Sequence, residues 1–191
     1  MCNRQEGEKE NHNYQKDTDF HYASRNGIIE VAEFFVESGK DVNVTNKYKE
    51  TPLHAASEQG QIEMVQFLVE NGAEIDAAND SQRTPLHIAT ENDQVEIAEF
   101  LIENGAEINA KNTHQETPLH VASKNGKIEL VRLLTENGAD INEKSDFQVR
   151  FIFQYFLILP HHFFTSTINF ISTGPVRKNI KKFLLFVSLL L

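Results

Sequence analysis

The sequence lacks the features of a secreted, disulfide-bonded or metal-binding protein. Its one cysteine, Cys2, cannot form a disulfide within the chain, and no cysteine–histidine spacing typical of a metal site occurs. Residues 1–6 contain no apolar stretch of the kind that a signal peptide needs. These absences favour a reducing intracellular compartment. We expect a cytoplasmic protein, with the nucleus as an alternative and membrane association through the C-terminal residues as a less favoured one.

Clustered basic residues are also missing from the centre of the chain. Residues 18–148 carry ten lysine and arginine residues against 24 acidic residues, a net charge of −14. Nucleic-acid binding needs clustered lysine and arginine side chains that neutralise phosphates, and docking on an anionic membrane surface has the same requirement. The composition therefore argues against both kinds of partner for this region.

Catalytic motifs are absent as well. The sequence has no glycine-rich phosphate loop and no nucleophile elbow, and its recurring acids and histidines follow a sequence repeat. We therefore expect that the protein is not an enzyme and uses no cofactor.

What the sequence has instead is one tetrapeptide, Thr-Pro-Leu-His, repeated every 33 residues. Its copies begin at Thr51, Thr84 and Thr117. A fixed period of this length is typical of solenoids, in which one small unit stacks on the next and an extended surface binds other proteins. The period divides the chain into four units, the first of them degenerate: residues 18–50, 51–83, 84–116 and 117–148.

Each unit carries the local signals of two helices. Thr51 is a helix N-cap, and Pro52 follows at the first helical position, where its missing N–H is not needed. Gly60 stands where the first helix ends in a left-handed turn, a position that Asp93 occupies in the third unit. The buried face of the second helix is expected to consist of Ile62, Val65, Leu68 and Val69.

The tetrapeptide, the period, the paired helices and the closing Gly-Ala-Asp/Glu-Ile/Val-Asn/Asp phrase resemble the ankyrin repeat family over about two thirds of the chain. The resemblance implies an all-α solenoid of four helix–turn–helix units with extended turn tips. It also implies a monomeric, non-catalytic adaptor or scaffold that binds a protein partner through its concave surface. Two alternatives are a membrane-associated protein held by its hydrophobic C-terminus and the targeting subunit of an enzyme complex.

The same resemblance places partner-binding residues on the turn tips and on the exposed side of the first helices. At the tips they are Lys47, Tyr48, Asp80, Ser81, Thr113 and His114. On the first helices they are Tyr22, Arg25, Glu58, Gln59, Glu91, Asn92 and Lys124. The two tyrosines stand out because exposed aromatic side chains often anchor interfaces, although Tyr22 fits a modified N-terminal cap equally well.

One histidine recurs at the same position of every unit: His21, His54, His87 and His120. Equivalent positions in stacked units lie about 10 Å apart, the thickness of a packed layer, whereas metal–nitrogen bonds measure about 2 Å. We therefore interpret these histidines as structural groups that hydrogen-bond locally and tie each turn to the next unit.

Two ladders of glutamate also recur, both on the second helices. One consists of Glu30, Glu63, Glu96 and Glu129, and the other of Glu37, Glu70, Glu103 and Glu136. We interpret them as solvated faces that keep the array soluble. The alternative is that they attract a basic partner.

Both ends of the chain differ from the repeats. Residues 1–17 form a polar leader that we expect to be disordered, and the repeat stops at residue 149. Residues 149–191 hold five basic residues, no acidic residue and eight of the 14 phenylalanines. This tail allows three interpretations: a membrane-associating segment, a folded apolar cap on the last unit, or translated intron sequence.

The intron interpretation is the one that we favour. The mostly apolar runs 151–159 and 183–191 are shorter than the about 20 residues of a membrane-spanning helix, and an acid-free tail is a poor match for the polar terminal units of solenoids. Gln148-Val149-Arg150, in contrast, is what a common splice-donor sequence encodes in frame. The tail would then be non-native, and a longer repeat array would continue in the spliced product.

Overall fold

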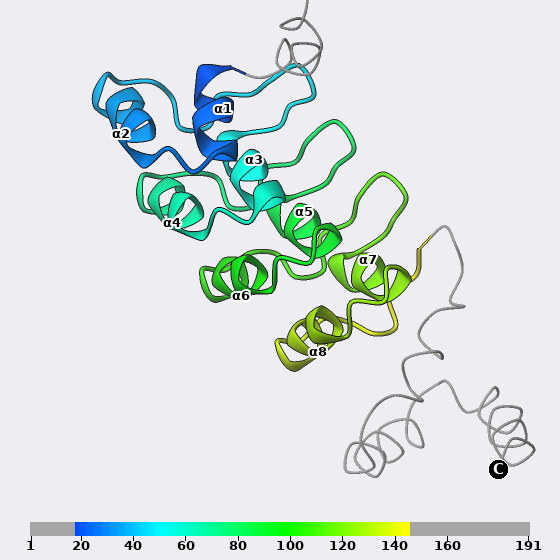
Figure 1. Ribbon diagram of the computed structural model, residues 1–191. Coiled ribbons are helices and arrows are strands. Elements are labelled where there is room, and N and C mark those ends of the chain that lie inside the picture. Colours follow the sequence, from blue (N-terminus) through cyan, green and yellow to red (C-terminus); the bar gives the residue numbers. More distant parts are fainter. Residues whose placement is uncertain (1–17, 146–191) are drawn as a thin grey trace, which may run out of the picture. The chain divides into compact units, whose positions relative to one another are not determined.

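A computed structural model describes residues 18–145 of the chain, and the leader 1–17 and the tail 149–191 lie outside these residues. The described part is all-α, without a strand, and its eight helices follow one another in pairs (Figure 1). They are α1 (Asp19–Arg25), α2 (Ile29–Glu37), α3 (Pro52–Gln59), α4 (Ile62–Glu70), α5 (Pro85–Glu91), α6 (Val95–Glu103), α7 (Pro118–Lys124) and α8 (Ile128–Glu136). The predicted all-α solenoid is confirmed.

The helices of the described part form two rows (Figure 1). The inner helices α1, α3, α5 and α7 pack successively on one another, and the outer helices α2, α4, α6 and α8 form the second row behind them. The loops that follow α2, α4 and α6 project beyond the inner row, and we call them the finger loops. The inner helices and the finger loops therefore share one side of the array.

The Thr-Pro-Leu-His tetrapeptide starts three of the inner helices. Thr51 is the N-cap of α3 in an extended conformation, and its backbone N–H donates to Nδ1 of His54 at 3.1 Å. The other ring nitrogen, Nε2, donates at 3.0 Å to the carbonyl of Arg83, which stands directly before the N-cap of α5. The same two contacts recur at His87, with Thr84 and with the carbonyl of Glu116. The histidines thus tie each helix start to the next finger loop, as predicted.

The core runs through every helix pair. Val65 and Leu68 are fully buried, as predicted, but Ile62 and Val69 are only half-buried, and Met64 is buried completely. The reason is that each helix pair is covered by the pair that precedes it in the array. Val31, which corresponds to Met64 in the first described pair, is 38% exposed because no described helix pair precedes it. Met64 therefore owes its burial to the preceding pair, which a single amphipathic helix cannot reveal.

Gly60 ends α3 in the left-handed region at φ 76°, and a Cβ added there would meet Oε1 of Gln94 at 2.6 Å. Gly72 has a similar φ of 89° but open space around it. We expect Gly72→Ala to cost about 1 kcal/mol of unfolding free energy through backbone strain alone, and Gly60→Ala about 2 kcal/mol because Gln94 must also move. Urea denaturation of the two variants measures the difference. Equal losses would show that the Gln94 contact adds no cost.

Candidate functional site

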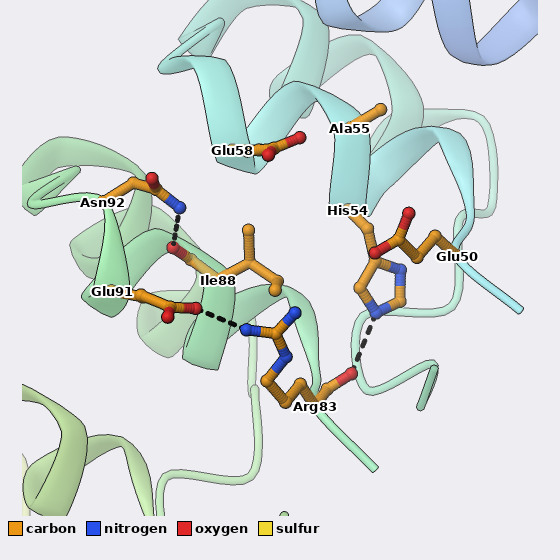
Figure 2. A pocket seen from close by; sticks show the side chains of 8 residues that line it. All are labelled: Glu50, His54, Ala55, Glu58, Arg83, Ile88, Glu91 and Asn92. Carbon is orange, nitrogen blue, oxygen red and sulfur yellow. Dashed lines mark hydrogen bonds and ion pairs between the residues drawn. The ribbon is translucent and has the colours of Figure 1, made fainter. Parts of the chain in front are cut away.

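Two neighbouring hollows lie along the inner row, between the inner helices and the finger loops. Hollow A, of about 310 Å³, is lined by Glu50, His54, Ala55, Glu58, Arg83, Ile88, Glu91 and Asn92 (Figure 2). Hollow B, of about 380 Å³, is lined by Ser81, Arg83, His87, Glu91, Asn112, Thr113, His114, Glu116, Val121, Lys124 and Asn125. Both hollows include Arg83 and Glu91, so they are neighbours, and we refer to the two together as the groove.

Two columns of charged side chains recur at the 33-residue period along the inner row, and most of their members line the groove. The helix column lies near the end of each inner helix: Arg25, Glu58, Glu91 and Lys124. The loop column stands directly before each N-cap threonine: Glu50, Arg83 and Glu116. The backbone carbonyl of each loop-column residue accepts a hydrogen bond from a histidine of the preceding pair, at 2.7 to 3.1 Å. The histidines thus fix where this column stands.

Most charges of the two columns are paired. Arg83 Nη1 contacts Glu91 at 2.5 Å, and Lys124 Nζ contacts Glu116 at 3.3 Å, so each loop-column residue meets the helix-column residue of its own pair. The second pair is the exception, because Glu50 and Glu58 are both acidic. Glu58 instead forms an ion pair with Arg25 of α1.

The histidines behind the groove are neutral. Burial lowers the pKa of His87 from 6.5 to about 4, and burial also lowers the pKa of His54 and His120. Their Nδ1 atoms accept from threonine N–H groups, so His54 and His87 have no free ring nitrogen for acid–base or metal chemistry. Within residues 18–145, no group of three metal-ligating side chains occurs.

The finger loops are held by a buried asparagine that sequence reasoning missed. Oδ1 of Asn79 accepts from the backbone N–H groups of Ser81 and Arg83 at 2.9 and 3.0 Å, which closes the loop tip. Asn46 and Asn112 make the equivalent contacts. Neighbouring tips are joined directly, since the Asp80 N–H donates to the Tyr48 carbonyl and the Thr113 N–H to the Ser81 carbonyl. Recurrence of asparagine at the 33-residue period was the available signal.

The groove contains about half of the residues predicted to bind a partner. Those that line one or both hollows are Glu58, Ser81, Glu91, Asn92, Thr113, His114 and Lys124. Those that line neither are Tyr22, Arg25, Lys47, Tyr48, Gln59 and Asp80. Tyr22 and Tyr48 are exposed by 45% and 39%. The prediction missed the whole loop column, whose side chains line the groove.

All eight glutamates of the two predicted ladders are exposed on the outer helices, as expected of solvated faces. None of the helices within residues 18–145 is both long and apolar enough to cross a bilayer.

Comparison with protein families identifies the repeat. A family model described as "Ankyrin repeats (3 copies)" matches residues 20–112 and 79–145, and so covers more than half of the chain. A comparison with curated proteins finds no match. Ankyrin repeats are generally protein–protein interaction modules, and the family is typically non-catalytic. The match extends over all eight described helices, and the chain belongs to the ankyrin repeat family.

Proposed function

We propose that this protein is a non-catalytic adaptor or scaffold that binds a protein partner in the groove formed by hollows A and B. The main support is a difference between the residues that hold the groove together and the residues that line it. The histidines and asparagines that build the groove repeat without change, whereas the side chains that face it differ in charge from one pair to the next. A constant scaffold with variable contact positions suits recognition of one particular partner.

A binding role also agrees with the chemistry of the groove. The buried histidines are neutral and hydrogen-bonded through both ring nitrogens, and most of the acids are held by ion pairs or amides. We propose that the protein acts as a monomer inside the cell, in the cytoplasm, where its one cysteine stays reduced.

The experiment is affinity capture of partners from cell lysate with the full chain, followed by mass spectrometry. The groove variant is Glu91→Ala with Lys124→Ala, which removes one acid and one base from the lining. We expect it to weaken capture about tenfold, because a few buried or central side chains carry most of the energy of an interface.

The matched control is Glu63→Ala with Arg132→Ala, which removes the same two charges from exposed sites on outer helices α4 and α8. It should retain the captured proteins. A third variant, with Tyr48, Asp80 and His114 changed to alanine, tests the finger tips. A groove variant that retains every captured protein would show that the groove is not the binding face.

A further inference from the structure

Hollows A and B are equivalent sites one repeat apart, and their charges differ. The four charged positions of hollow A are Glu50, Glu58, Arg83 and Glu91. The equivalent positions of hollow B are Arg83, Glu91, Glu116 and Lys124. Hollow A therefore has three carboxylates and one guanidinium, a formal charge of −2, whereas the two acids and two bases of hollow B cancel. The histidines and asparagines that hold the two hollows are the same, so the difference in charge comes from the side chains that line them.

The charge of hollow A is not neutralised from within. Arg83 contacts only Glu91 through Nη1, and its buried Nε has no hydrogen-bond partner among the described residues. Arg25 pairs with Glu58 from the side of α1. Glu50 accepts a hydrogen bond from the amide of Asn46 at 3.1 Å, and no lysine or arginine within residues 18–145 lies within ion-pair distance of it. Glu50 thus retains an uncompensated charge.

The walls of hollow A add an apolar contact to this charge. Figure 2 shows the Glu50 and Glu58 side chains on one side of the hollow and Arg83 and Ile88 on the other. Ile88 is 5% exposed and lies on the same wall of the hollow as Arg83, where it adds a small apolar surface. Lysine and arginine side chains combine an apolar stem with a cationic head. In hollow A the stem can contact Ile88, and the head can pair with the carboxylates.

The acids of hollow A also differ from the glutamate ladders in how far they are recessed from solvent. A charge pair at a recessed, partly desolvated site is stronger and less screened by salt than a pair on an open helix face. The ladder glutamates lie on the exposed faces of the outer helices and line neither hollow. Of the two hollows and the two ladders, hollow A is therefore the one that combines a negative charge with a recessed shape and an apolar wall.

We propose that hollow A takes a lysine or arginine side chain of the protein partner, with Glu50 as its main counter-ion and Glu58 as the second. This inference rests on the proposed function. It adds which kind of partner side chain is recognised and where along the array that side chain binds. The basic residue lies between α3 and α5. The neighbouring hollow B, one repeat further along, has no such preference, because Arg83 and Lys124 already supply its positive charge.

The test is selection of a random peptide library, displayed on phage, on the immobilised full chain. We expect the selected peptides to share a lysine or arginine at one fixed position. Synthetic peptides of the selected sequences should bind the Glu50→Gln/Glu58→Gln variant about tenfold more weakly, since each charge pair in a partly open site contributes a factor of about two to five. Glutamine preserves the shape of both side chains, so the loss reports charge.

The matched control is Glu63→Gln/Glu96→Gln on outer helices α4 and α6, which removes the same charge outside the groove. It should bind the peptides as the unchanged chain does. The inference is overturned by peptides without a fixed basic residue, by equal binding to the Glu50→Gln/Glu58→Gln variant, or by a selection that enriches no peptide. If the Glu91→Ala/Lys124→Ala variant still weakens capture of partners from lysate, the proposed function is supported even though this inference fails.

Discussion

Acidification from pH 7 to pH 4 is expected to lower the free energy of unfolding by about 3 kcal/mol through His87 alone. His87 is completely buried, and this burial lowers its pKa from 6.5 to about 4. In the unfolded chain the imidazole takes up a proton near pH 6.5, whereas the folded protein resists protonation until about pH 4. The contribution of His87 is therefore complete above pH 6.5 and is lost as the pH falls between these two values.

The hydrogen bonds of His87 explain why the folded protein rejects the proton. Nδ1 accepts from the Thr84 N–H at 3.2 Å, while Nε2 donates to the Glu116 carbonyl at 3.1 Å. A proton added to Nδ1 would face another N–H donor, so the imidazolium must break the N-cap of α5. His54 makes the same contacts and also has a lowered pKa, which extends the acid sensitivity to the preceding helix pair.

The measurement is the unfolding free energy from urea titrations at several pH values between 7 and 4. Carboxylates titrate in the lower part of this range, so the comparison is with His87→Gln, which cannot be protonated. Its stability should fall less steeply with pH than that of the unchanged chain. Equal slopes for the chain and His87→Gln, or an NMR titration of His87 near pH 6.5, would contradict the expectation.

The sequence predicts the framework of the described part well because its signals are local. The caps of the inner helices and the left-handed turn at Gly60 depend on residues within one unit. The second ring nitrogen of His54 bonds to the carbonyl of Arg83, which stands directly before the next N-cap, and the strict recurrence of the histidine already indicated such a link. Features that repeat with the framework can therefore be predicted from one chain.

The groove could be predicted only in part because its contacts join different units. Glu50 and Arg83 stand in the turn before an N-cap, and the residue at this position changes from Glu50 to Arg83 and back to Glu116, so periodicity did not single them out. Their role follows from the hydrogen bonds that hold the loop against the preceding pair. The pairing of Arg25 with Glu58, rather than with a residue of its own unit, is likewise a property of the stacked array.

Replacement of Leu101 by alanine is expected to lower the free energy of unfolding by about 3 kcal/mol. Leu101 is 0% exposed in outer helix α6, which contacts both α4 and α8. The truncated side chain leaves a cavity that neighbouring helices fill only in part, because their positions are fixed by the caps and ties of the inner row. In a linear array each unit is stabilised only by its neighbours, so a central defect weakens the units on both sides.

Chemical denaturation followed by circular dichroism measures this loss, and Ile128→Ala is the matched control. Ile128 is 51% exposed at the start of α8, so its truncation removes less buried surface, and we expect it to cost under about 1 kcal/mol. A loss at Leu101 that also changes the slope of the denaturation curve would show that the array no longer unfolds as one cooperative unit. A loss at Leu101 no larger than that at Ile128 would mean that the described helix pairs do not share a continuous core, contrary to the burial of Leu68, Leu101 and Leu134 in successive outer helices.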